Sequence, residues 1–451
     1  MYKSQDKKTL PLFGELFPFG GKLDENNRWL KIAGLIPWDE IEDSYRKHFS
    51  AIGRPALDSR LAIGVMILKH ITVLSNEEMV LELSENPYLQ AFCGFDNFQT
   101  GKVFDSSSLS KLRKRPGAKY FKELGNQTYE VLIEKKIIKC KGLLVDATVF
   151  PEKIKYPTDV GLLNEAREWL VKKIKDVGVK VGKSFRTYPR AARKAYLQFS
   201  KSKKRTKKKV AKAKKAMLQY VRRNIKQFEE VLAAAAEQGL MIEDKVIERF
   251  AVIGKLYAQQ FLMYKEKISR VPDRIVSLSR AWVRPMVRGK TGKSRGSWRQ
   301  VEFGPKAALS YVDGFVFLDH LDHDNFSEGS LAKKQLGNYK ERFGKKPPYM
   351  IGDQTYGNRN NRELLKSEEI RDAFEPLGRK VRQKTPRDRW RKQKSVGAWR
   401  QRERNRIEGL IGHAKEHFEL EKIRYYIDDG AEIWARMGLL GMNLKIAIKR
   451  I

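Results

Sequence analysis

The 451-residue sequence predicts a mixed α/β fold, with helices around a mixed sheet, an all-α region before it and a large helical insertion within it. Apolar, β-branched segments typical of strands occur at 142–150, 301–321 and 349–357. A helical pattern fills roughly 160–290. Without that insertion the order is strand, hairpin, helix, strand, helix, strand, helix, which is compatible with a mixed sheet flanked by helices.

The region before residue 130 is expected to form a small helical module. Asp58 precedes an apolar run that begins at Leu61, so it is expected to cap a helix. Ser75 opens a second helix, and Glu78 stands three residues later, which is the signature of a capping box.

The stretch FDSSSLSKLRKRPG (104–117) predicts a short helix with a cationic outer face. Leu109 and Leu112 give it an inner face, and Pro116 with the following glycine is expected to end it. Such a helix can lie on DNA phosphates or enter a groove, and a solvated surface helix is the alternative. The cations expected on the outside are Lys111, Arg113, Lys114 and Arg115.

Two predicted strands carry an aspartate. GLLVDATVF (142–150) is an apolar strand interrupted by Asp146, an unfavourable place for an acid without a partner. The segment YMIGDQTYG (349–357) is expected to contain a second, short strand that ends at Asp353. Between them, an Asp-Gly pair at 313–314 is a strong signal for the turn of a β-hairpin.

The insertion contains the run KSKKRTKKKVAKAKK (201–215), in which ten of fifteen residues are Lys or Arg. The run is expected to continue into a helix. We interpret it as a basic helical arm for DNA, and a plain exposed helix is the alternative.

Bulk composition narrows the possible partners. The chain carries 92 Lys and Arg against 54 Asp and Glu, a formal net charge of +38, which favours a nucleic acid over an anionic membrane surface. No apolar run approaches the roughly 18 residues needed to span a bilayer. The first residues lack the apolar segment of a secretory signal, and the two cysteines exclude a disulfide framework or a Cys-rich zinc site. We therefore expect a cytoplasmic protein without a membrane partner.

The segment ERNRIEGLIGHAKEHF (403–418) is expected to be a helix with two distinct faces. Relative to Glu408, Arg404 is offset by about 40°, and Lys415 and Gln401 by about 20°, so these four residues form one stripe. His413 and His417 lie about 140° and 180° away, so they cannot share a metal ion with Glu408. A zinc site at HAKEH and an ordinary charged helix are the alternatives to a metal-binding acid at this position.

Three acids could form a site for phosphodiester chemistry. Two divalent cations stabilise the attacking and leaving oxygens in such chemistry, and carboxylates are the ligands that magnesium and manganese prefer. Asp146, Asp353 and Glu408 occur in the order strand, strand, helix, in a strongly basic chain.

These pieces together resemble bacterial insertion-sequence transposases of the DDE type, which have a ribonuclease H-like catalytic core. The matching stretches are LLVDATV with KYPTDVGLLNEAREWL, LDHLDHDNFSEG, MIGDQTYGNRNNRELL and RERNRIEGLIGHAKEHFELEKIRYY. The N-terminal stretch LSNEEMVLELSENPYLQAFCGFDNFQ looks like the helical module that precedes the core in one branch. The resemblance covers most of the chain.

The resemblance implies a domain plan and a reaction. Residues 1–130 would be a DNA-binding module, 131–159 with 285–425 the core, 160–284 the basic helical insertion, and 426–451 a helix that packs on the core. The enzyme would bind terminal inverted repeats, cleave DNA at the transposon ends and join the 3′-hydroxyl to target DNA. A metal-dependent nuclease without strand transfer, or a catalytically inactive DNA-binding protein of transposase origin, are the alternatives.

The resemblance also implies roles for single residues. Asp146, Asp353 and Glu408 would be the catalytic triad and hold Mg²⁺, with Mn²⁺ as a substitute. Arg404 and Lys415 would contact transposon-end DNA, whereas Gln401 stands where this branch usually has tyrosine. The partners would be double-stranded DNA and a second copy of the chain, and the protein would be associated with the nucleoid.

Overall fold

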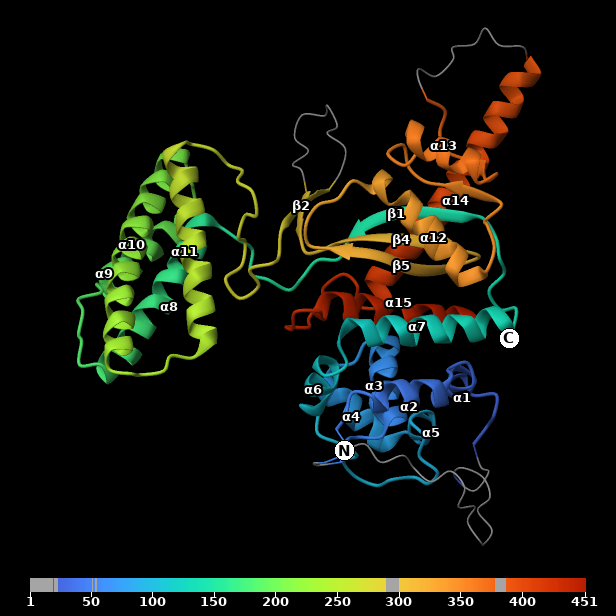
Figure 1. Cartoon of the computed structure of the whole chain (residues 1–451), viewed down its shortest axis with the longest axis horizontal. Coiled ribbons are helices and arrows are strands. Elements are labelled where there is room, and N and C mark those ends of the chain that lie inside the picture. The colour runs from blue at the N-terminus through green and yellow to red at the C-terminus, as the bar shows by residue number, and fades with distance from the viewer. Residues whose placement is uncertain (1–18, 20–22, 51, 53–54, 289–299, 378–386) are drawn as a thin grey trace. The chain divides into compact units, whose positions relative to one another are not determined.

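The computed structural model describes residues 19, 23–50, 52, 55–288, 300–377 and 387–451. The chain forms two compact units (Figure 1). Unit 1 comprises Met1–Glu152 and Pro305–Ile451, and unit 2 comprises Lys153–Gly304. The expected mixed α/β class is confirmed, because unit 1 combines helices with a mixed sheet of five strands.

Unit 1 begins with a group of helices whose predicted caps are confirmed. The Asp58 carboxylate accepts the N–H groups of Arg60 and Leu61 at 2.9 and 3.1 Å. Ser75 and Glu78 exchange hydrogen bonds of 2.8 and 3.1 Å, which completes the capping box. The helices are α1 (Arg28–Ala33), α2 (Trp38–Arg46), α3 (Ser59–Thr72), α4 (Asn76–Glu85), α5 (Pro87–Phe92), α6 (Ser108–Lys114) and α7 (Gly117–Glu134).

The five strands of unit 1 have the order β5-β4-β1-β6-β7. The central strand β1 runs antiparallel to β4 and parallel to β6. The predicted hairpin is confirmed at β4–β5, where Asp313 and Gly314 have φ of 51° and 94°, as a type I′ turn requires. The strands are β1 (Leu143–Val149), β4 (Lys306–Val312), β5 (Phe315–Asp322), β6 (Tyr349–Ile351) and β7 (Arg371–Asp372).

The hairpin starts later than the sequence predicts. Residues 301–303 were expected to belong to it, but they lie in β3 (Gln300–Phe303), which pairs with β2 (Pro285–Arg288) in unit 2. The alternating apolar pattern is the same in both strands, so it could not show which partner each one takes.

The remaining helices of unit 1 connect its layers. The 3₁₀ turn η2 (Glu328–Leu331) leads into α12 (Ala332–Phe343), which ends at Gly344 in the left-handed conformation. The helix α13 (Arg359–Ser367) follows β6, and α14 (Arg387–His417) packs on β1 and β6. The last helix, α15 (Gly430–Ala447), contacts α3, α7 and β5, so the N-terminal helices and the sheet share one core (Figure 1).

Unit 2 has a core of its own. Four helices, with Leu163, Leu170, Val221, Phe228 and Ile253 among their buried residues, form a second apolar cluster. The basic run of the insertion continues into the longest of them, as predicted. The helices are α8 (Asp159–Lys180), α9 (Pro189–Ser200), α10 (Lys207–Glu237) and α11 (Asp244–Lys265).

No helix in the described ranges is both long enough and apolar enough to cross a bilayer.

Candidate functional site

The sheet brings two of the predicted acids to the same edge. In the parallel pairing of β1 and β6, Leu144 lies opposite Ile351. Asp146 and Asp353 are each two residues beyond these partners. Continuing the register therefore places Asp353, just beyond the end of β6, beside Asp146 in the middle of β1.

Asp146 is half-buried and its charge is disfavoured. Burial raises the pKa of Asp146 to about 6, the Ala147 N–H lowers it through a hydrogen bond of 2.8 Å, and the charges of Glu328 and Asp353 raise it again. The positive charge of Arg404 also lowers this pKa. An acid held close to other acids in this way needs a cation to be fully ionised at low cost.

The loop after β6 fixes the Asp353 carboxylate by one oxygen. Oδ1 accepts the Thr355 hydroxyl at 2.6 Å and the N–H groups of Thr355 and Tyr356 at 2.9 and 3.3 Å. These bonds hold the side chain at the start of a turn. Oδ2 accepts no hydrogen bond from the described residues, so it is available to a ligand.

The structure adds a fourth acid, Glu328, which the sequence analysis did not select. Its charge raises the pKa of Asp146, and its carboxylate pairs with Lys306 at 2.9 Å. The Asn361 amide donates to the Gly329 carbonyl at 2.8 Å and to the Tyr356 carbonyl at 2.9 Å. This bridge ties η2 to the turn that carries Asp353. The available signal was an acid in the first turn of the helix that follows the hairpin.

Tyr356 lies among these acids. Its side chain is fully buried, and its hydroxyl has no hydrogen-bond partner among the described residues. Burial raises the pKa of Tyr356, and the charges of Glu328, Asp146 and Asp353 raise it further. The charges of all three carboxylates therefore act on one buried phenol.

Glu408 is less enclosed than the aspartates. Its side chain is 54% exposed and pairs with Arg404 one turn earlier on α14, at 3.6 Å. Because α14 packs on β1 and β6, and Arg404 also acts on Asp146, this stripe of the helix belongs to the same neighbourhood. Gln401 is exposed on α14 and donates to Asn405 at 2.8 Å.

Asp146 and Asp353 offer carboxylate oxygens of the kind that a divalent cation binds. Oxygen ligands of this kind are those that Mg²⁺ takes. Across the described ranges, however, no three His, Cys, Asp or Glu side chains are gathered closely enough to hold a metal ion together. The charges of Glu328 and Asp353 act on Asp146, whereas Glu408 has an exposed side chain on α14.

The two histidines of HAKEH form an exposed pair. Their rings lie 4.6 Å apart between centroids, on the exposed side of α14. Burial, followed by the charge of His417, lowers the pKa of His413. They belong to no metal-binding group among the described residues, which leaves the zinc alternative without support.

The residues predicted to bind DNA differ in exposure. Lys415 is half-buried, and Lys111, Lys114 and Arg115 are exposed. The predicted exposure of Arg113 is wrong, because this side chain is only 6% exposed. Its guanidinium donates to Asn76 Oδ1 at 2.9 Å and lies 4.0 Å from the ring centroid of Tyr425, so a partner more than 300 residues away covers it.

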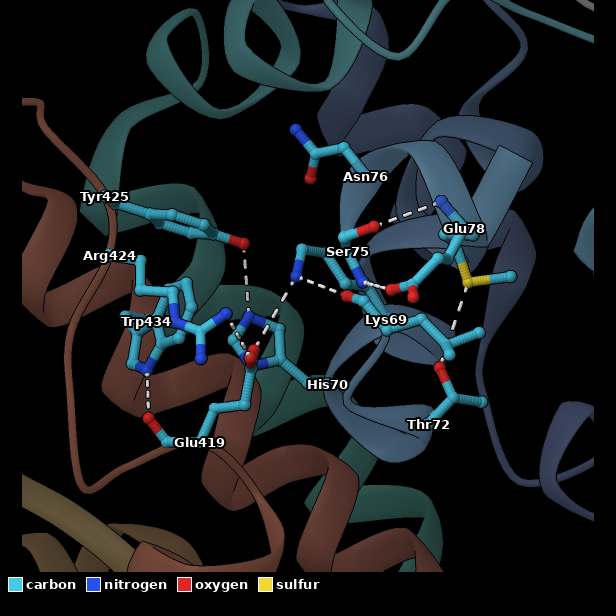
Figure 2. A network of polar contacts seen from close by, with 12 residues as sticks. Lys69, His70, Thr72, Ser75, Asn76, Glu78, Glu419, Arg424, Tyr425 and Trp434 are labelled. Carbon is cyan, nitrogen blue, oxygen red and sulfur yellow. Dashed lines mark hydrogen bonds and ion pairs between the residues drawn. The ribbon is translucent and has the colours of Figure 1, made fainter. Parts of the chain in front are cut away.

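A buried polar network joins α3 to the chain after α14 (Figure 2). Arg113 borders it through its contact with Tyr425. Lys69 pairs with Glu419 at 3.6 Å, and Arg424 approaches the same carboxylate at 3.3 Å. His70 is fully buried and shares a hydrogen bond of 3.2 Å with the Tyr425 hydroxyl. Burial lowers the pKa of His70 well below its ordinary value, so the imidazole is neutral. The network fixes the N-terminal helices to the segment that follows the Glu408 helix.

The fold and the site define an α/β protein with aspartates on and just beyond two neighbouring parallel strands and a helical N-terminal module. Residues 17–115, which form most of that module, match the family described as "Transposase domain (DUF772)". The chain is 36% identical over 169 residues to "Uncharacterized protein ORF8 in nfe locus" of Rhizobium meliloti. That match covers 37% of this chain and 80% of the relative. No solved structure matches. The chain belongs to the insertion-sequence transposase family, which confirms that part of the resemblance found in the sequence.

Proposed function

We propose that this protein is a DDE-type DNA transposase with a ribonuclease H-like core, which cleaves DNA at transposon ends and joins the 3′-hydroxyl to target DNA. The observation that carries the proposal is the pair Asp146 and Asp353 at matched positions of neighbouring parallel strands. The sheet order, with its antiparallel hairpin beside two parallel strands, and the helix α14 across β1 and β6 support the same proposal.

Asp146 and Asp353 would hold Mg²⁺, or Mn²⁺ in its place, and Glu408 would supply the third carboxylate. When bound, the metal supplies charge stabilisation for the attacking and leaving oxygens of the phosphodiester. Asp353 is suited to this role because three hydrogen bonds orient Oδ1, while Oδ2 accepts none from the described residues. The raised pKa of Asp146 also supports a role in holding a metal ion, because a nearby cation would favour the ionised form of this side chain.

Arg404 would have two tasks. It pairs with Glu408 at 3.6 Å and its charge acts on Asp146, so it can hold the third acid near the other two. Together with Lys415 it would also contact the phosphates of transposon-end DNA. A dimer would bring the two ends together, as in the family.

The test is cleavage and joining on a supercoiled plasmid that carries the element's ends. The native chain is compared with Asp146→Asn, Asp353→Asn and Glu408→Gln, and with Glu416→Gln as a matched control on an exposed side chain of α14. We expect the three site variants to bind the ends and to lose both steps by at least about a thousandfold, and the control to retain them. Site variants that cut like the native chain would refute the proposed site.

A second arm tests metal ligation separately from positioning. Asp353→Cys introduces a softer ligand, which favours Mn²⁺ over Mg²⁺. We expect this variant to be inactive in Mg²⁺ and partly active in Mn²⁺. Equal inactivity in both metals would mean that Asp353 acts only through the turn that it stabilises.

The products distinguish the alternatives. A nuclease without strand transfer would cut the ends but never join a 3′ end to target DNA. An inactive DNA-binding protein of transposase origin would bind the ends, cut nothing, and bind equally well with and without Mg²⁺.

A further inference from the structure

The net charge of the chain is concentrated in unit 2. Residues 153–304 contain 39 Lys and Arg and 13 Asp and Glu, a net charge of +26 out of the chain's +38. The catalytic proposal uses none of these residues. A folded unit with this excess repels itself, so a polyanion that neutralises it would bind favourably.

The excess is greatest between residues 177 and 228. This segment has nineteen Lys and Arg and no Asp or Glu. Eighteen of the nineteen are exposed, and Lys214 is the exception. Lys214 is buried beside Asp159, with 2.9 Å between Nζ and Oδ2. Among the described residues, it is also the only one of the nineteen that pairs with a carboxylate. The exposed cations of this segment thus lack acidic partners within the described protein.

The cations are held on a regular scaffold. The helix α10 packs on α8, α9 and α11, and Val221 and Phe228 on its inner face are fully buried. Five of its exposed cations lie within about 40° of one line along the helix, and Val221 and Phe228 lie about 140° and 160° away from that line. The stripe consists of Lys208, Lys212, Lys215, Arg222 and Lys226.

A neighbouring pair of arginines is also preorganised. The guanidinium groups of Arg186 and Arg223 each lie 4.9 Å from the ring centroid of Tyr188. The ring holds both cations near the start of α9, where Tyr188 adopts a left-handed conformation. Stacked guanidinium groups lose less conformational freedom when they bind an anion than free side chains do.

We propose that the stripe on α10 binds the backbone of duplex DNA, independently of sequence, and that unit 2 thereby holds DNA outside the transposon ends. The stripe spans about 27 Å, and over that length of its helix axis one strand of duplex DNA carries roughly eight phosphates, one per about 3.4 Å. Cations spaced along one helix face fit a regular row of phosphates. The choice of duplex DNA as the polyanion rests on the proposed function. The charge and geometry of the stripe are independent of that function.

The test measures binding of the full-length protein to a labelled duplex without transposon ends, in EDTA, over a series of salt concentrations. In the test variant the five stripe residues are changed to Gln. In the matched control the same number of exposed lysines on α8 and α11 are changed to Gln, namely Lys172, Lys175, Lys245, Lys255 and Lys265. Both variants lose the same net charge, so only the position of the charges differs.

We expect the native chain to show a steep loss of affinity with salt. Each phosphate contact contributes about 0.9 to the slope of log K against log salt, so the variant without the five stripe cations should lose about 4.5 from that slope. At about 0.1 M salt it should bind at least tenfold more weakly. The control should change the slope by less than about 1.

Three results would overturn the proposal. Equal loss in the stripe and control variants would mean that only total charge matters. An unchanged stripe variant would mean that DNA binds elsewhere. Preference for single-stranded or duplex RNA over duplex DNA would change the partner.

Circular dichroism of each variant confirms that the helices are intact. The duplex-binding assay needs neither metal nor cleavage. Its result can therefore contradict the proposed role of the stripe while the plasmid assay supports the proposed function, and the opposite outcome is equally possible.

Discussion

The two units handle charge in opposite ways. Unit 1 contains 53 Lys and Arg and 41 Asp and Glu, and it encloses several of them as pairs or clusters. The Lys69–Glu419 pair has side chains only 5% and 4% exposed, and Asp146 is held close to other acids. Unit 2 keeps almost all the cations of residues 177–228 in solvent and without acidic partners.

This difference separates two tasks. A buried charge fixes a position, because removing its partner leaves an uncompensated charge in a poorly solvated place. An exposed charge contributes little to folding but remains available to a polyanion. We therefore expect substitutions in unit 1 to change stability or chemistry, and substitutions of cations in unit 2 to change DNA affinity.

The largest stability effect is expected at the buried network. Lys69→Met leaves Glu419 without one of its two cations, which should lower the free energy of unfolding by about 3 kcal/mol. Lys102→Met is the control, because its pair with Asp105 is 59% and 58% exposed, and it should cost far less. Denaturant unfolding measures both. Similar losses in the two variants would contradict the contrast between buried and exposed charge.

A smaller effect is expected at Asp146 as the pH changes. Its folded pKa of about 6 lies above the ordinary value of 3.8, so the folded state binds more protons between these values. The free energy of unfolding should therefore fall as pH rises from about 4 to 6, and the full cost is present above pH 6. In EDTA, Asp146→Asn should be more stable than the native chain at pH 7.5, by about 1–2 kcal/mol, and not at pH 4.

Urea unfolding at a series of pH values measures this difference. An advantage of Asp146→Asn that is the same at pH 4 and pH 7.5 would show that the carboxylate is not destabilised by its ionisation. Added Mg²⁺ should reduce the advantage at pH 7.5, because the ion favours the ionised form of the native side chain.

The smallest effect is expected from salt on unit 2. Screening relieves repulsion among exposed cations, so raising the salt from about 0.05 to 0.5 M should slow hydrogen exchange in α10 by up to about fivefold. The core of unit 1, observed at α3 and α15 of the same protein, should change less. Conversion of the five stripe residues to Gln should remove most of the salt effect on α10. Equal responses of α10 and α3 would argue against concentrated repulsion in unit 2.

Local signals predicted much of the fold. The cap at Asp58, the capping box at Ser75 and the hairpin turn at Asp313 each depend on a few adjacent residues, and each is confirmed. These features succeed because the residues that make them also carry the hydrogen bonds that stabilise them.

The errors arise from partners that are distant in sequence. Arg113 follows the pattern of an exposed helix residue, but Asn76 and Tyr425 enclose it. Glu328 resembles an ordinary acid in the first turn of a helix, and only the folded sheet brings it near Asp146. The order of strands and helices could be predicted, whereas the neighbourhood of each acid depends on strand pairing that a single sequence does not contain.

The most direct test of this division of tasks measures two quantities on the same protein preparations. One is affinity for an end-free duplex in EDTA, and the other is the single-turnover rate of end cleavage in Mg²⁺ at saturating protein. Asp146→Asn should keep the affinity within about twofold and lose cleavage by at least about a thousandfold. The stripe variant should lose affinity at least tenfold and keep the saturated cleavage rate within about threefold. Loss of both quantities in either variant, or cleavage by Asp146→Asn at the native rate, would contradict the account.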